Sequence, residues 1–273
     1  MERGELEAIA RELQSAYETG QGLSAFLSAR SGFDLDAAYE VEAELKRSRE
    51  AQGAKSVGRK VGYANKAVWR VFKLQTLVWG HMYDDTVHYS DSNQATLALA
   101  HPHSLKVEPE IVFGLNQPIL SAGIDAKAAL ESTDWLAIGF EVIDCPFPDW
   151  KFQPSDFVAY YGLHAALVVG ERVPVQPEII PGFLDELSQF KVRLAKNGEP
   201  VAEGAGKNSL ASPAACLAEL STAILRRFPH EPLRAGELIS SGTLTPGHST
   251  ERGDEWKVEV NGLPLPPLTL RMS

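Results

Sequence analysis

The chain has 273 residues, with 36 acidic and 26 basic side chains and a formal charge of −10. This excess of negative charge opposes general binding to nucleic-acid phosphates and to anionic membranes. No run of about 18 or more apolar residues occurs, and the first residues lack the apolar segment of a signal peptide, so we expect a cytoplasmic protein with no membrane span.

The N-terminal part of the chain has the pattern of two amphipathic helices. Leu6, Ile9, Leu13 and Tyr17 are spaced to form one apolar stripe, and a second apolar set follows the possible helix cap Asp34. We therefore predict a helical region over residues 1–55, followed by a main domain over residues 56–273.

The main domain is dominated by short apolar runs separated by Gly, Pro, Asn and Asp, as is typical of strands. The predicted strands are 110–115, 136–143, 165–169, 192–195, 238–241 and 256–260. Asn197-Gly198 and Asn261-Gly262 are two-residue hairpin signals, and Ser212-Pro213 begins a helix. Because strands and helices do not alternate regularly, we predict an α+β fold with a mixed or antiparallel sheet and helices at one side.

Two carboxylates share one predicted strand, in the segment 105–115. Glu108 and Glu110 are two residues apart, so strand alternation places both on the same face, where like charges repel unless a partner neutralises them. A third carboxylate, Glu141, lies within an otherwise apolar strand, where an unpaired charge is costly. Three carboxylates from two strands can converge on one cation.

Oxygen ligands without Cys or His suit a hard divalent cation, with Mg²⁺ first and Mn²⁺ or Ca²⁺ as competitors. The spacing alone leaves another interpretation open. Glu108 and Glu110 can be surface residues of an edge strand, and Glu141 can pair with an Arg or Lys.

These acidic segments resemble a known family. Residues 108–113 (EPEIVF) and 140–144 (FEVID) resemble the V-E-x-E-[IL]-[AV]-F and A-x-E-[IV]-[IV]-D segments of the fumarylacetoacetate hydrolase superfamily. The branch of 2-keto-4-pentenoate hydratases and 4-oxalocrotonate decarboxylases is the most similar. Further segments resemble this branch in the same order along the chain: 38–42, 58–62, 80–85, 235–245 and 253–254.

The resemblance implies a mixed β-sandwich roll with a helical N-terminal portion. It also implies that Glu108, Glu110 and Glu141 bind Mg²⁺, or Mn²⁺ as the alternative. Members of the family act on small 2-oxo or 2-hydroxydienoic acids through a metal-stabilised enolate. They form homo-oligomers, and the hydratases associate with related decarboxylases, so either kind of partner is expected here.

The resemblance also suggests residues that act on the substrate. Lys60, in a strand-like stretch between glycines, matches an active-site lysine that holds a carboxylate or moves a proton, although a solvated strand-end lysine is the interpretation without the family. Asp84 matches an acidic residue that works with this lysine, with Asp85 as the competing choice. Thr243 is expected to contact the substrate carboxylate or a metal-bound water, or else to be a turn hydroxyl.

Two segments depart from the family pattern. Where the hydratases read D-x-[IV]-A-D-N-A-S, the segment 156–164 is aromatic, and Tyr160 and His164 are predicted either to shape a pocket for a different or bulkier acid or to be buried structural residues. Where the family has P-[DS]-[YF]-G, residues 77–80 read L-V-W-G, which makes Trp79 a further candidate for substrate contact.

The sequence therefore predicts a metal-dependent lyase that hydrates or decarboxylates a 2-oxo or 2-hydroxydienoic acid. An acylpyruvate-type C-C bond hydrolase is the alternative enzyme, because the same enolate chemistry serves it. A non-catalytic subunit of a hydratase or decarboxylase complex is the alternative from another class.

Overall fold

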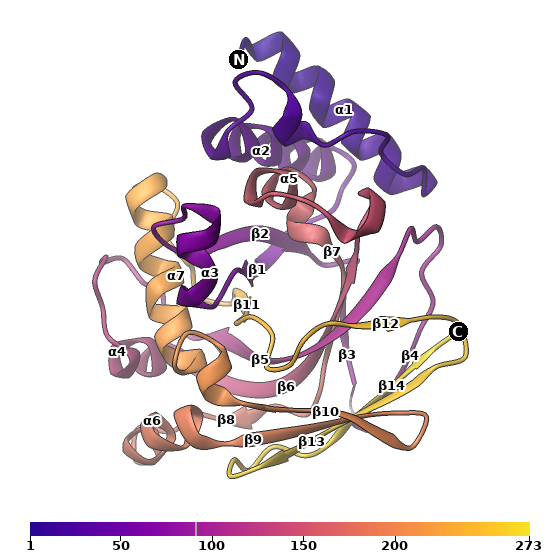
Figure 1. Ribbon diagram of the computed structural model, residues 1–273. Coiled ribbons are helices and arrows are strands. Elements are labelled where there is room, and N and C mark those ends of the chain that lie inside the picture. The colour runs from indigo at the N-terminus through magenta and orange to yellow at the C-terminus, as the bar shows by residue number, and fades with distance from the viewer. Residues whose placement is uncertain (91) are drawn as a thin grey trace.

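The computed structural model describes residues 1–90 and 92–273. Their strands form two sheets (Figure 1). The larger of two hydrophobic clusters includes buried residues of both sheets and of the helices. The helices are α1 (Arg3–Thr19), α2 (Leu35–Ala51), α3 (Lys66–Phe72), α4 (Ala126–Glu131), α5 (Pro154–Ala159), α6 (Ile180–Gln189) and α7 (Pro213–Arg227). Every helix in the described part of the chain is too short or too polar to span a lipid bilayer.

The larger sheet has the strand order β2-β1-β11-β5-β6-β7-β3, with β12 beside β5 and β8 beside β6. Its strands are β1 (Ser56–Gly62), β2 (Val78–Tyr83), β3 (Val87–Tyr89), β5 (Leu105–Leu115), β6 (Thr133–Asp144), β7 (His164–Val169), β8 (Val173–Pro174), β11 (Leu238–Ser240) and β12 (His248–Thr250). Most neighbours are antiparallel, but β1 with β11 and β3 with β7 are parallel. The predicted mixed α+β fold is confirmed.

The smaller sheet has the order β10-β9-β13-β14-β4. Its strands are β4 (Gln94–Leu97), β9 (Lys191–Lys196), β10 (Glu199–Ala205), β13 (Glu255–Asn261) and β14 (Leu268–Met272). The predicted hairpin at Asn197-Gly198 is confirmed, since both residues have positive φ and join antiparallel β9 and β10.

The two-residue hairpin predicted at Asn261-Gly262 is wrong. β13 and β14 are antiparallel neighbours, but β14 begins only at Leu268. The connection contains Pro264, Pro266 and Pro267, which have no backbone N–H to give to a ladder, so the pairing cannot start directly after the turn.

The predicted N-terminal helices are present and cover one side of the larger sheet together with α5 (Figure 1). In α1, Ile9 and Leu13 are buried as the apolar stripe requires. In α2, the side chain of Asp34 caps the helix by accepting a hydrogen bond from the backbone N–H of Ala37 at 2.9 Å. The site described next lies on the central strands β5 and β6 and on the neighbouring β11.

Candidate metal centre and cavity

The three predicted carboxylates lie together on the two central strands of the larger sheet. Glu108 and Glu110 are on one face of β5, and antiparallel pairing places Glu141 of β6 directly opposite Glu108. Each residue offers one carboxylate oxygen, and these oxygens lie within 4.8 Å of one another. Glu110 faces Gly139 across the ladder, where a Cβ would lie only 2.7 Å from Val112. The strand register therefore gathers the carboxylates on one face.

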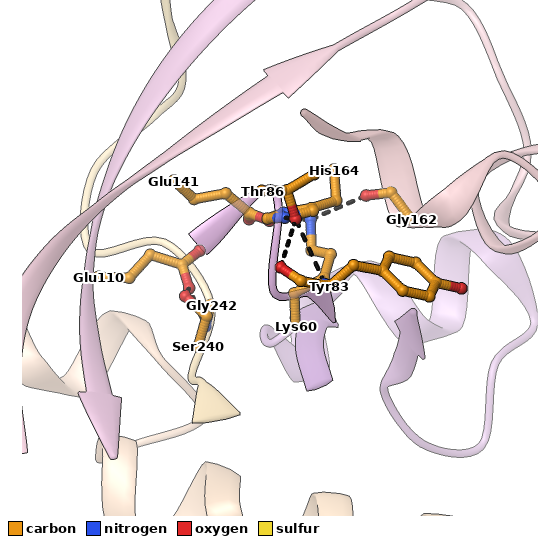
Figure 2. Close-up of polar contacts among 9 residues, drawn as sticks. All are labelled: Lys60, Tyr83, Thr86, Glu110, Glu141, Gly162, His164, Ser240 and Gly242. Carbon is orange, nitrogen blue, oxygen red and sulfur yellow. Dashed lines mark hydrogen bonds and ion pairs between the residues drawn. The ribbon is translucent and has the colours of Figure 1, made fainter. Parts of the chain in front are cut away.

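The carboxylate of Glu110 is fully buried and anchored through one oxygen (Figure 2). Its Oε2 accepts hydrogen bonds from the Ser240 hydroxyl at 2.5 Å and from the Gly242 backbone N–H at 2.8 Å. Within the described residues, its other oxygen, Oε1, is buried without a hydrogen-bond partner. A buried carboxylate oxygen without a partner is costly, and a cation beside it would remove that cost.

Glu141 is held between a lysine and a histidine (Figure 2). Its Oε2 pairs with Lys60 Nζ at 2.9 Å, and its Oε1 lies 3.1 Å from His164 Nδ1. Lys60 Nζ also donates a hydrogen bond to the Gly162 carbonyl at 2.8 Å, and His164 Nε2 lies 3.0 Å from the Thr86 hydroxyl. These contacts fix both the lysine and the carboxylate.

The pKa values of the three carboxylates are shifted in different directions. Burial raises the pKa of Glu108 to about 7, with the negative charge of Glu141 adding to the effect while Lys60 opposes it. Burial and the charges of Glu141 and Glu108 raise the pKa of Glu110 well above its usual value. Burial also opposes ionisation of Glu141, but Lys60 and His164 outweigh it and lower its pKa. Without a cation, Glu108 and Glu110 therefore hold their protons more tightly than usual, and a divalent cation would allow all three carboxylates to ionise, so this donor set fits such an ion.

The stability of a metal-free Glu108→Gln protein, measured against the wild type, should be greater at pH 8 than at pH 5. The raised folded-state pKa means that the folded chain holds this proton more tightly than the unfolded chain. The proton on Glu108 therefore stabilises the folded wild type. This contribution is fully present below the ordinary glutamate pKa of 4.5 and is lost as the pH rises through the folded-state pKa of about 7. The free-energy difference between variant and wild type should therefore shift by about 2 kcal/mol in favour of the variant between pH 5 and pH 8.

Urea unfolding in EDTA at the two pH values measures this shift. Glu199→Gln is the matched control, because Glu199 is exposed. An equal difference for Glu108→Gln at both pH values would contradict the raised pKa.

A cavity of about 650 Å³ opens beside the carboxylates. Lys60, Glu108 and Thr243 line it together with Asn65 and Asn208. Its remaining wall is mainly apolar, and its aromatic members are Tyr63, Phe72, Trp150, Phe152 and Phe157. A concave, mostly apolar space with a few convergent polar groups is the usual form of a small-molecule site.

Glycines allow Lys60 to reach its partners. Gly162 has a φ of +62°, and a Cβ there would lie 2.8 Å from Lys60 Cδ. Gly62 lies against Phe157, and a Cβ there would come within 2.3 Å of the ring. Close packing therefore requires glycine at both positions, against the lysine stem at Gly162 and against the Phe157 ring at Gly62.

Asp84 and Lys60 are not brought together by this structure. β1 and β2 are antiparallel with Lys60 opposite Gly80, so residues beyond Tyr83 lie at the other end of β1. There Asp84 is exposed and accepts a hydrogen bond from the Lys55 backbone N–H at 2.9 Å, outside the cavity. The competing choice, Asp85, pairs with Arg49 at 2.6 Å. The prediction of a Lys60–Asp84 pair is corrected by this register.

Three residues predicted to contact substrate also lie outside the cavity lining. Trp79 is buried against Tyr39, with ring centroids 4.6 Å apart, and Tyr160 is 1% exposed and packs edge-to-face on Tyr17. His164 lies behind Glu141, where it contacts the carboxylate and not the open space. Each is a buried structural or positioning residue, which for Tyr160 and His164 is the alternative stated above and for Trp79 replaces the expected substrate contact.

The aromatic residues that line the cavity and the two groups that anchor Glu110 are not among the residues predicted from the sequence. The available signals were Tyr63 directly after the Lys60 strand and a cluster of aromatic residues around Pro154. Ser240 and Gly242 lie in the segment 235–245, which resembles the family, but Thr243 is the residue of this segment that the sequence predicts to contact substrate or water. Which side chain of a glycine-rich turn faces a carboxylate is decided by the neighbouring strand.

Comparisons with known proteins identify the family of the chain. The model of the fumarylacetoacetate (FAA) hydrolase C-terminal family matches residues 54–268. The chain is 28% identical over 258 residues to a 2-hydroxyhexa-2,4-dienoate hydratase of Comamonas testosteroni, covering 94% of each protein. It is 30% identical over 226 residues to a 4-oxalocrotonate decarboxylase of Pseudomonas sp. strain CF600, covering 83% of this chain and 81% of that one.

A solved structure has the same fold over the full chain. The 4-oxalocrotonate decarboxylase from Pseudomonas putida G7, complexed with magnesium and adipate, superposes with a TM-score of 0.89 at 24% identity and covers 100% of this chain and 99% of the other. The predicted family and fold are both confirmed. The chain belongs to the fumarylacetoacetate hydrolase family, in the branch of the 2-keto-4-pentenoate hydratases and 4-oxalocrotonate decarboxylases.

Proposed function

We propose that this protein is a divalent-metal-dependent lyase that hydrates or decarboxylates a 2-oxo or 2-hydroxydienoic acid. The observation that carries the proposal is the convergence of Glu108, Glu110 and Glu141 next to buried Lys60 at the edge of a cavity. The hydratase and decarboxylase relatives support the reaction class.

Glu108, Glu110 and Glu141 would hold the cation. An all-oxygen donor set favours Mg²⁺, with Mn²⁺ as the alternative. When bound, such an ion supplies a Lewis acid that stabilises negative charge developing on the 2-oxygen of the substrate. The partnerless Oε1 of Glu110 supports this assignment.

Lys60 is the residue placed to act on the substrate. It has three N–H donors, of which one pairs with Glu141 and one is donated to the Gly162 carbonyl. Because Lys60 lines the cavity, its remaining donor can hold the substrate carboxylate or move a proton at carbon 3. The Phe157 ring, 4.8 Å from Nζ, keeps water from the ammonium group.

Thr243 is placed to orient a water molecule. Its hydroxyl proton is donated to the Thr245 carbonyl at 2.6 Å, so its oxygen remains an acceptor. An acceptor suits water better than the substrate carboxylate, which was the other expectation for this residue. Asp84 has no place in this arrangement.

The test follows the ultraviolet absorbance of 2-hydroxypenta-2,4-dienoate and of 2-hydroxymuconate with Mg²⁺, Mn²⁺ or EDTA, with CO₂ release assayed alongside. We expect absorbance to decay only with a divalent cation, and CO₂ then distinguishes decarboxylation from hydration. A protein that binds Mg²⁺ but turns over no dienoic acid of any chain length or end group would reject the lyase and favour C-C hydrolysis or a non-catalytic role. Self-association and a cytoplasmic location stay predictions.

A further inference from the structure

The cavity has an apolar end that the proposed chemistry does not use. Tyr63 packs edge-to-face on Phe72 and Phe157, with ring centroids 5.1 Å and 5.5 Å away, and Phe152 stacks on Phe157 at 6.4 Å. Trp150 completes this aromatic wall. The rings hold one another in place, so the wall is formed before any ligand arrives.

Most of the aromatic wall is only half-buried. Phe157 is 6% exposed, whereas Tyr63, Phe72, Trp150 and Phe152 all retain intermediate exposure. Grouped aromatic surface that borders a polar site in this way marks a place where an apolar ligand group is covered.

The charged residues that line the cavity are Lys60 and Glu108, and Lys60 lies next to Phe157 of the aromatic wall. Among the described residues that line it, Lys60 is the only cation, and it is already paired with Glu141. Lys106 lies close to Trp150, with Nζ 3.9 Å from the ring centroid, but it does not line the cavity. A second carboxylate on a substrate would therefore lose its water against the aromatic wall without gaining a cationic partner.

The cavity is also larger than a small unsubstituted acid needs. A space of about 650 Å³ falls within the range that holds drug-sized ligands, and an unsubstituted pentadienoate is far smaller. If such an acid bound at the carboxylates and Lys60, the aromatic wall would remain in contact with water.

We propose that the substrate is a monocarboxylic acid whose chain ends in an uncharged apolar group, up to the size of a phenyl ring, which packs against the aromatic wall. This inference rests on the proposed function for the 2-oxo acid end, which binds at Glu108, Glu110, Glu141 and Lys60. It selects an apolar substituent over a second carboxylate at the far end.

The test measures binding of three saturated 2-oxo acids that a diene lyase cannot turn over, by calorimetry in saturating Mg²⁺. The probes are 2-oxopentanoate, 5-phenyl-2-oxopentanoate and 2-oxoadipate. We expect the phenyl acid to bind at least about tenfold more tightly than 2-oxopentanoate, because it buries apolar surface, and 2-oxoadipate to bind no better than 2-oxopentanoate.

A charge placed in the wall should invert this preference. Phe72 ends α3 and is half-buried, so Phe72→Lys should weaken binding of the phenyl acid about tenfold and tighten binding of 2-oxoadipate. Val71→Lys adds the same charge one residue earlier, at a position 74% exposed and outside the cavity, and should leave both affinities within about twofold.

The outcomes separate the inference from the proposed function. The inference would be overturned if the wild type bound 2-oxoadipate as tightly as the phenyl acid or more tightly, or if it bound none of the three acids. In either case, turnover of any dienoate would still uphold the lyase. Tight binding of the phenyl acid, lost in Phe72→Lys, would uphold the inference even if no dienoate were turned over, which would reject the lyase.

Discussion

Glu110→Gln should lose metal-dependent turnover by at least about 100-fold, since even the loss of groups that only orient metal ligands costs 10- to 100-fold. Glutamine has nearly the same shape, and its carbonyl oxygen can accept the hydrogen bonds from Ser240 and Gly242. The substitution removes the ability to ionise. In the wild type, ionisation of this buried group is unfavourable, since burial raises the pKa of Glu110 well above its usual value. The metal-free variant should therefore be at least as stable as the wild type.

Thermal unfolding with and without Mg²⁺ checks this expectation independently of activity. At 100 times its dissociation constant, the cation should stabilise the wild type by about 2.7 kcal/mol and the variant far less. Glu199→Gln, an exposed carboxylate changed in the same way, should behave as the wild type. A Glu110→Gln protein that keeps the full stabilisation by Mg²⁺ would remove Glu110 from the metal centre.

Lys60→Met should lower kcat by about 10²- to 10⁴-fold, the usual contribution of a positioned proton donor or acceptor. Methionine fills the space of the lysine stem beside Gly162 but cannot pair with Glu141. Because it leaves a buried carboxylate without its cation, it should also destabilise the metal-free protein by about 3–5 kcal/mol.

Steady-state kinetics and urea unfolding measure the two effects of Lys60→Met. Bound Mg²⁺ supplies positive charge beside Glu141, so it should restore part of the lost stability without restoring turnover. Lys55→Met is the control, because Lys55 is exposed just before the same strand. Wild-type turnover by Lys60→Met would show that the lysine serves only to hold the strands together.

The carboxylates were predictable because strand alternation is a local property. Glu108 and Glu110 fall on one face whatever the rest of the chain does, and an isolated Glu141 in an apolar strand calls for a partner wherever it packs. Asp84 shows the limit of such reasoning. The segment 80–85 matches it to the family residue, but the register of β2 on β1 places it at the end of β1 away from Lys60, and no local pattern encodes that register.

The positions of the aromatic residues were also only partly predictable from the sequence. Tyr160 and Trp79 have the composition of pocket residues, but they pack against Tyr17 and Tyr39 of the N-terminal helices. Of the residues that do line the cavity, Tyr63 is marked only by its position directly after the Lys60 strand, and Phe72 has no distinguishing pattern in the sequence. Burial against a helix or exposure to a cavity depends on distant packing, so the composition of a segment does not predict it.

The anchor of Glu110 ties the metal centre to the order in which the protein is made. Ser240 and Gly242 reach this carboxylate across 130 and 132 positions of the chain. At translation rates of 5–20 residues per second, the ribosome needs roughly 6 to 26 s to deliver them after Glu110 has been added. During that time the nascent chain contains the acidic strands but not β11, which covers the β5 edge in the finished sheet. The cation site can be assembled only on a nearly complete polypeptide, so a chain released early by a premature stop codon should present an uncovered strand edge to chaperones and proteases.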